Sequence, residues 1–195
     1  MTTIRNLDDY SGEFFPSAKF ADLSKDALVR LCQNYQRIFV GYMGMWHTVN
    51  EEKGMSPEEA WDMDSYVYER QIPVFEVPLV REALNIQGND VVSMFKYFQF
   101  TLDGARQETF DYRYEVENNN HVRLTCHYCA TLHYYERHGD DKGIELLCLP
   151  GGCEDRSFNA IAKAFNPDIK CIPVKLPPRK NKDDICCIWD FRLEK

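Results

Sequence analysis

The stretch FDYRYEVENNNHVRLTC, residues 110–126, decides the fold of this chain. In its first half apolar and charged residues alternate, and in its second half Val122, Leu124 and Cys126 alternate with polar ones. A period of two is typical of a strand with one buried face. The three asparagines between the halves are turn residues, so the stretch predicts a β-hairpin. The inward residues of its first strand are expected to be Phe110, Tyr112, Tyr114 and Val116.

Upstream of the hairpin the pattern is helical over residues 24–100. Ser24 is a typical N-cap, and Gly54 closes a run in which apolar residues recur every three or four positions. Those residues are Leu28, Leu31, Tyr35, Ile38, Phe39 and Tyr42. Ser56, followed by Pro57, opens a second helix that Pro73 and Pro78 are expected to interrupt. A third helix is predicted over residues 90–102.

Downstream of the hairpin, a helix over residues 154–165 precedes two strands, 169–176 and 185–193. In the last strand Cys187, Trp189 and Phe191 share one face. Helices followed by an antiparallel sheet with interspersed helices predict an α+β fold. We expect a single domain over residues 1–195, with a helical part at about 20–103 and a cysteine-rich α+β part at about 105–195.

Composition narrows the class of function. The net charge is -8, and no long basic stretch is present, which argues against nucleic-acid binding. The basic cluster Lys175, Arg179, Lys180 and Lys182 is interpreted as a solvated hairpin tip. No apolar run approaches the length of a membrane span, and the first ten residues do not resemble a signal peptide. The sequence therefore predicts a cytoplasmic protein with reduced thiols, without nucleic-acid or membrane partners.

Cysteines are concentrated in one part of the chain. Seven of the eight lie between Cys126 and Cys187, and the other is Cys32. A chain of 195 residues can build a core without disulfides, so these thiols suggest packing, metal binding or catalysis. The aromatic content of 13% suits a cavity for an organic ligand, although most such residues belong to ordinary cores.

The segment TCHYCATLHYYERH, residues 125–138, is the first candidate for chemistry. If a helix begins near Cys126, then Cys126, Cys129, His133 and Glu136 form one stripe along it. Such a stripe could be a nucleophile with its base and orienting group, part of a metal site, or a redox pair. Equally, the cysteines could be small core residues with His133 and Glu136 solvated.

A second set of cysteines suggests a zinc site. Cys171 and Cys187 each begin a strand of the last hairpin, so their pairing is expected to bring the two thiols together. Cys148 or Cys153 would add a third ligand. The predicted metal ligands are Cys153, Cys171, Cys187 and Cys126, for zinc or another divalent metal; the alternative is that these thiols are only packed.

Two further features concern a ligand pocket. His47, amid Met43, Trp46 and Val49, is a candidate catalytic residue facing a pocket between helices and sheet, although many such histidines are simply satisfied at the edge of a core. The Gly151-Gly152 loop opens the helix at 154. Acidic Glu154 and Asp155 in its first turn oppose an anion and favour capping of the helix dipole.

The C-terminal part resembles a known family. The residues that carry the resemblance are Cys129, Glu136, Cys148 or Cys153, FNAIAKAFNPDIKC over 158–171 and CIWDF over 187–191, together with MWHTVNEEKGMSPEEAWDMD over 45–64. They are similar to the largely uncharacterised bacterial proteins related to L-2-amino-thiazoline-4-carboxylate hydrolase. That resemblance implies hydrolytic opening of a small cyclic substrate, for which Cys129, His133 and Glu136 would supply nucleophile and proton transfer.

The last helix and hairpin also resemble vinyl-reductase-type small-molecule-binding domains. This second resemblance implies zinc bound by cysteines beside an enclosed cavity, but the hairpin here is longer by residues 177–184. Three functions follow as expectations: a hydrolase acting on a small cyclic molecule, a non-catalytic zinc-containing binding module, and a thiol redox protein. The lack of an output domain favours the enzyme over a sensor. The expected partners are a small-molecule ligand or substrate and a second copy of the chain in a homo-oligomer.

Overall fold

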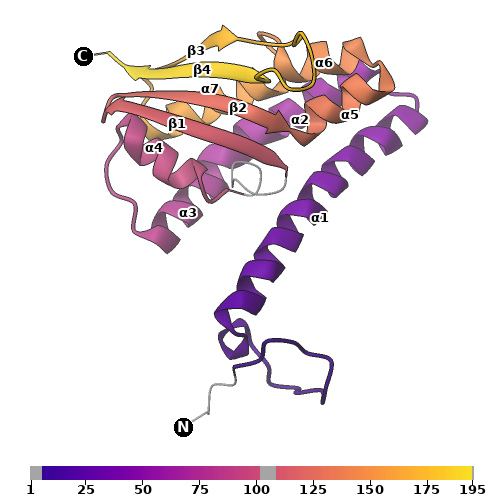
Figure 1. The fold of residues 1–195 in the computed structure, drawn as a ribbon, viewed down its shortest axis with the longest axis vertical. Coiled ribbons are helices and arrows are strands. Elements are labelled where there is room, and N and C mark those ends of the chain that lie inside the picture. Colours follow the sequence, from indigo (N-terminus) through magenta and orange to yellow (C-terminus); the bar gives the residue numbers. More distant parts are fainter. Residues whose placement is uncertain (1–5, 102–108, 195) are drawn as a thin grey trace.

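The computed structural model describes residues 6–101 and 109–194, and it has the predicted α+β fold. Four antiparallel strands form one sheet in the order β1-β2-β4-β3. Their bounds are β1 Phe110–Asn118, β2 His121–Cys129, β3 Ile169–Lys175 and β4 Cys187–Leu193. Helices pack against one face of this sheet (Figure 1). The expected boundary between the helical and α+β parts, at 103–105, lies outside the described residues.

The hairpin of residues 110–126 forms as its alternation predicts. Tyr112 lies opposite Cys126, Tyr114 opposite Leu124 and Val116 opposite Val122. The side chain of Asn118 accepts a hydrogen bond from the backbone N–H of Asn120 at 2.8 Å, which closes the turn. The expectation that Val116 points into the core is wrong, because this residue near the tip of edge strand β1 is 60% exposed.

The first two helices begin at their predicted caps. In α1 (Lys25–Glu52) the Ser24 hydroxyl accepts from the backbone N–H of Ala27 at 3.0 Å. In α2 (Pro57–Gln71) Ser56 and Glu59 form a reciprocal capping box, with Pro57 in the first turn. Gly54 between them has φ 89°, a left-handed conformation that favours glycine.

Pro73 and Pro78 interrupt the α-helix, as predicted, but the chain remains helical through them. A π-helical turn, η2 (Ile72–Glu76), follows α2 directly and leads into α3 (Val77–Leu84). Its wider spacing is seen at Val77, whose N–H bonds to the carbonyl of Ile72 five residues back. Since proline lacks an N–H and crowds the preceding turn, this wider turn accommodates Pro73 while the chain remains helical.

The remaining helices surround the core. They are α4 (Val91–Phe98), α5 (Ala130–His138), α6 (Asp141–Cys148) and α7 (Cys153–Phe165). The sequence patterns do not predict α6. α4 and α7 pack on the sheet, and α2 packs on the other side of α7. Phe158 of α7 meets Trp189 and Phe191 of β4 edge to face, with ring centroids 5.2 and 5.5 Å apart, and these buried aromatics centre the core.

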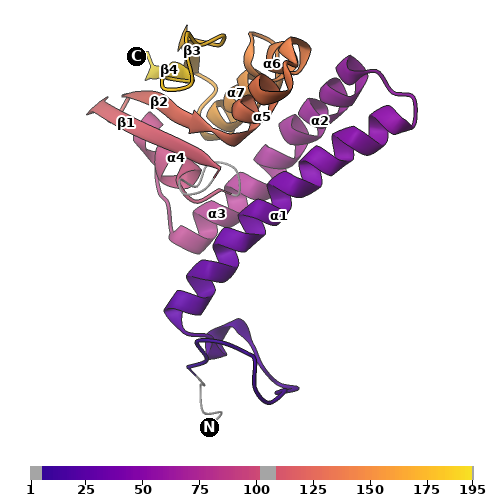
Figure 2. The same cartoon turned by 45° about the vertical axis from the view of Figure 1, so that its right-hand side comes forward.

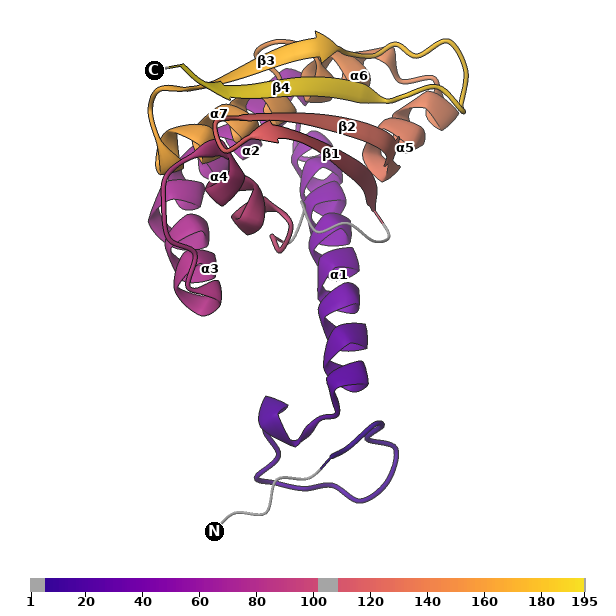
Figure 3. The same cartoon turned by 60° about the vertical axis from the view of Figure 1, so that its left-hand side comes forward.

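Helix α1 lies outside this packing. Its C-terminal part contacts α2, while its N-terminal part extends away from the body of the molecule in every view (Figures 1, 2 and 3). None of its 28 residues is buried. No helix within residues 6–101 and 109–194 combines the length and the apolar character needed to cross a membrane.

Candidate functional site

A cavity of about 680 Å³ lies between the C-terminal half of α1, the start of α7, α5 and the adjoining ends of β1 and β2. This volume lies within the range of small-molecule sites. Its lining is rich in aromatic side chains, among them Trp61, Tyr68, Phe110, Tyr112, Tyr128 and Phe158. The aromatic side chains in this sequence therefore serve a cavity as well as the core.

Glu154 is the most strongly perturbed acid on the cavity wall. It lies in the first turn of α7, and its Oε1 is 3.8 Å from the Cys187 thiol of β4. Burial raises the pKa of this carboxyl to about 7, although the hydrogen bond from Cys187 opposes the shift. A carboxyl with such a pKa exchanges its proton near neutral pH.

The helix-capping role expected of Glu154 and Asp155 belongs to Asp155. The Oδ2 atom of Asp155 accepts a hydrogen bond from the backbone N–H of Gly151 at 2.8 Å, and its Oδ1 accepts from Asn159 at 2.9 Å. Asp155 therefore holds the loop before α7, which leaves Glu154 with its Oε1 beside the Cys187 thiol.

His47 of α1 lines the same cavity, as predicted, and is held by α2. Its Nε2 is 3.4 Å from Oδ2 of Asp64, and its ring lies 4.1 Å from that of Trp61. Asp64 also accepts from the thiol of Cys153 at 3.9 Å. The Nδ1 atom of His47 is buried and has no hydrogen-bond partner among the described residues. In the tautomer in which Nε2 donates to Asp64, Nδ1 carries the lone pair that a base requires.

Three cysteines come together where β2 pairs with the start of β4. Cys126 of β2 lies directly opposite Cys187 of β4, and its thiol donates to the carbonyl of Tyr128 at 3.1 Å. The neighbouring thiols of Cys186 and Cys187, together with burial, raise the pKa of Cys126. The contact with Cys126, and then the Arg179 guanidinium at 3.4 Å, lower the pKa of Cys186 to about 7 against the effect of burial.

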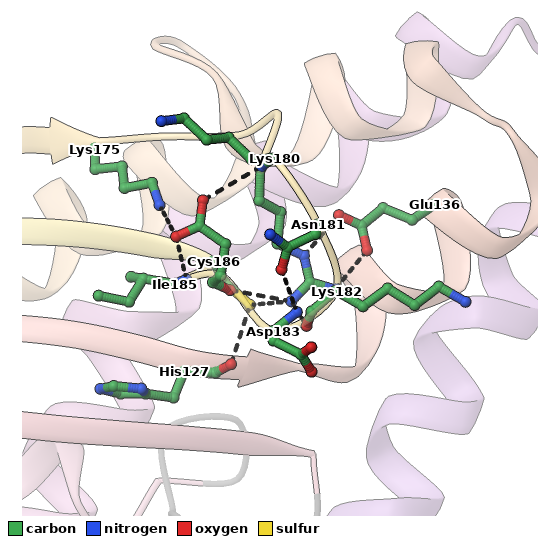
Figure 4. Close-up of polar contacts among 11 residues, drawn as sticks. His127, Glu136, Lys175, Lys180, Asn181, Lys182, Asp183, Ile185 and Cys186 are labelled. Carbon is green, nitrogen blue, oxygen red and sulfur yellow. Dashed lines mark hydrogen bonds and ion pairs between the residues drawn. The ribbon is translucent and has the colours of Figure 1, made fainter.

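Arg179 is a structural cation that the sequence interpretation missed. Its side chain is 3% exposed, so its assignment to a solvated hairpin tip is wrong. It forms a bidentate pair with Glu136 at 2.8 and 2.5 Å and donates to the carbonyl of Lys182 at 2.9 Å. Figure 4 shows Glu136, Lys182 and Cys186, the partners of these contacts. The carboxylate of Glu136 and the carbonyls of Lys182 and Asp184 therefore offset its burial.

The predicted stripe of Cys126, Cys129, His133 and Glu136 does not form. β2 continues to Cys129 and α5 begins only at Ala130, so Cys126 and Cys129 lie on a strand. Cys129 and His133 line the cavity, whereas Glu136 is paired with Arg179. Cys129 instead caps α5, where its sulfur accepts from Leu132 N–H at 3.3 Å, and burial raises its pKa well above that of a free thiol.

Of the four predicted metal ligands, Cys126 and Cys187 lie together, whereas Cys171 and Cys153 lie apart from them. Cys171 lies opposite Phe191, four residues from Cys187, because residues that begin two antiparallel strands sit at opposite ends of the pair. Cys171 donates to the carbonyl of Phe158, and Cys153 contacts Asp64. Within the described residues, no group of three or more histidine, cysteine or acidic side chains is arranged to hold a metal ion. Zinc binding stays a prediction.

Fold and site define the class of this protein: an α+β domain with an aromatic cavity, on whose wall an acid of raised pKa and a histidine–aspartate pair meet a cluster of thiols. The chain belongs to a family of unknown function (DUF6125), whose model matches residues 20–193. No curated protein and no solved structure matches it. The resemblances to the thiazoline-carboxylate hydrolase family and to vinyl-reductase-type domains therefore remain predictions.

Proposed function

We propose that the protein is an enzyme that hydrolyses a carbon–nitrogen bond in a small, cyclic, basic organic molecule. The observation that carries this proposal is the placement of two proton-transfer groups of different character in one aromatic cavity. Glu154, with a pKa of about 7, is suited to be a general acid, and His47, held by Asp64, is suited to be a general base.

The charge of the cavity supports a basic substrate. Glu51, Asp64, Asp140 and Glu154 line it, whereas Arg137 is the single lysine or arginine among its described lining residues. Aromatic faces such as those of Trp61 and Tyr68 favour a flat cation, because a cation is attracted to the electron-rich face of a ring. A protonated ring containing a C=N bond, such as a cyclic amidine, combines these properties.

The reaction assigned to the site consumes one water molecule. His47 Nδ1 takes a proton from water while the water oxygen adds to the ring carbon, and the C=N double bond becomes a single bond. Glu154 then gives its proton to the departing ring nitrogen as the carbon–nitrogen bond breaks. The hydroxyl oxygen of the adduct forms the C=O double bond as its proton passes to the Glu154 carboxylate, and the imidazolium gives its proton to the released amine, so that both groups are restored. The thiol of Cys129 takes no covalent part, because its raised pKa keeps it neutral.

The test is turnover of a panel of cyclic amidines, imidazolines and thiazolines in ¹⁸O-labelled water, followed by mass spectrometry. We expect ring opening of at least one compound, with one labelled oxygen in the product. Glu154→Gln and His47→Gln should each lower kcat/KM by about 10²–10⁴-fold. Asp155→Asn, which neutralises the neighbouring carboxylate and can still accept the bond from Gly151, should stay within about threefold of the unmodified protein.

Two results would overturn this assignment. Ring opening that Glu154→Gln leaves unchanged would remove the acid from the mechanism. Saturable binding of panel members without any turnover would favour the non-catalytic small-molecule-binding module instead.

A second candidate, a thiol redox protein, is favoured by the pairing of Cys126 with Cys187. Residues directly opposite in an antiparallel pair have Cα atoms about 4.5–5.5 Å apart, a separation that a disulfide can bridge. Oxidation by oxidised glutathione would convert two thiols to one disulfide and yield two molecules of reduced glutathione. Thiol titration and peptide mapping should show a reversible loss of two thiols, and an unchanged titre at equilibrium would exclude this candidate.

A further inference from the structure

The outer face of α1 carries a regular apolar seam. Residues recur there at alternating spacings of three and four, which is the heptad pattern of positions a and d in a coiled coil. The members of the seam are Leu28, Leu31, Tyr35, Ile38, Tyr42, Met45 and Val49. The pattern has a period of 3.5 residues and continues for three heptads without a polar member.

Five of the seven seam residues are exposed to solvent, and Leu28 and Leu31 are half-buried. Ile38 and Tyr42 are each 63% exposed and Met45 is 62% exposed, while Tyr35 and Val49 are 45% and 39% exposed. On a helix of 3.6 residues per turn, the centre of the seam points away from Met43 and His47, which face the cavity. Met45 is the seam residue that also borders the cavity. The cavity side of α1 is therefore used within the chain, and most of the seam is not.

The composition of α1 calls for a partner along this face. Gly41 and Gly44 each reduce the stability of a helix by about 1 kcal/mol relative to alanine. A helix within a protein gains most of its stability from packing against a neighbour. A Cβ atom added at Gly41, which flanks the seam, would meet nothing within 4 Å. No contact within the described chain requires a glycine at this position, whereas a neighbouring helix that approaches closely does.

We infer that the seam is the contact between two copies of this chain, whose α1 helices pair in antiparallel orientation. Charge supports this partner and this orientation. The N-terminal half of α1 has Lys25, Arg30 and Arg37 against Asp26, and the C-terminal half has Glu51 and Glu52 with no lysine or arginine. Antiparallel pairing therefore sets basic against acidic ends and opposes the helix dipoles.

The flanks and the area of the seam also fit a second copy. The flanking e and g positions within residues 27–48 hold no charged residue, so two copies meet without like-charge repulsion. At about 180 Å² for a large side chain, the exposed portions of five seam residues amount to roughly 500 Å² per copy. Two copies then reach roughly the 1,000 Å² that a specific interface requires.

The test is sedimentation equilibrium of the full chain over about 1–100 µM. We expect a mass twice the 22.9 kDa of the chain. Ile38→Glu should weaken association at least about 100-fold, because it places a carboxylate in the seam, whereas Ile38→Leu should leave it unchanged. Val67→Glu, an equivalent change at a 53% exposed residue of α2, is the matched control and should remain dimeric. Circular dichroism of each variant verifies that it folds.

Orientation is tested by the distance between two spin labels. In a Cys32→Ser background, a label at Lys25→Cys should give roughly 35–45 Å between copies if the helices are antiparallel, given a rise of about 1.5 Å per residue. A distance below about 20 Å would contradict antiparallel pairing. A chain that is monomeric at about 100 µM, or a dimer that Ile38→Glu leaves intact, would overturn the inference. Binding of a monomer to anionic phosphatidylserine vesicles would assign the seam to lipid instead.

Discussion

Glu154 links stability to pH as well as to the proposed chemistry. Its carboxyl has a pKa of about 7 in the fold, against an ordinary value of 4.5. Because the fold favours the protonated form, the stabilisation is fully present below pH 4.5 and is lost as the pH rises through about 7. The side chain therefore makes the molecule less stable at alkaline pH.

Glu154→Gln should remove this dependence. From pH 4 to pH 8 the free energy of unfolding of the unmodified protein should fall by about 3 kcal/mol relative to the variant, at 1.36 kcal/mol per pKa unit. Urea denaturation at several pH values measures the difference, with Asp155→Asn as the control that keeps most of the dependence, because burial is the main cause of the shift and the Asp155 charge the smallest. Parallel curves for the unmodified protein and Glu154→Gln would contradict the burial of this carboxyl.

Among the charged side chains of the candidate site, Arg179 is the one whose loss should lower the free energy of unfolding most. Arg179→Met leaves Glu136 without its bidentate partner in a half-buried site, and we expect a loss of about 3 kcal/mol in the free energy of unfolding. Arg113→Met is the control, because the Arg113 side chain is 58% exposed and its pair with Asp111 contributes little. If chemical denaturation shows an equally small loss in the free energy of unfolding for both variants, the structural role of Arg179 is refuted.

At the scale of elements, the junction of β2 and α5 explains why the predicted stripe fails. Alternation of buried residues continues through Val122, Leu124 and Cys126, and pairing with β1 carries the strand on to Cys129. Local sequence favours either state over residues 126–129, and the partner strand decides between them. The sequence therefore predicts the hairpin but not the residue at which helix replaces strand.

Cys129 at this junction has a role that substitution can separate from nucleophilic catalysis. Cys129→Ala removes the cap of α5 and should lower the free energy of unfolding by about 1 kcal/mol. Cys129→Ser supplies an oxygen cap, so its loss of stability should be smaller. Both variants should retain turnover of a panel substrate within about tenfold. Thermal denaturation and kcat/KM provide the two readings, and a loss of turnover beyond about 10³-fold in a folded Cys129→Ser would restore this thiol as the nucleophile.

At the scale of the whole molecule, the fold class follows from periodicity, but the site does not. Hydrophobic spacing and caps such as Ser24 and Ser56 act locally, which is why the first two helices and the hairpin are predicted closely. The site depends on contacts between distant residues: Cys187 meets Glu154 across 33 positions, and Cys153 meets Asp64 across 89. His47 was identifiable from its apolar surroundings, whereas no local signal separated Glu154 from the capping Asp155.

The pH dependence of kcat/KM for a panel substrate tests the proposed mechanism most directly. If Glu154 must donate a proton, kcat/KM should fall about tenfold per pH unit above a pKa near 7. The Asp155→Asn variant should keep this alkaline limb, shifted to lower pH, because the Asp155 charge contributes the smallest part of the raised pKa of Glu154. A profile that stays level from pH 6 to pH 9 in the unmodified protein would contradict the assignment of Glu154 as the general acid.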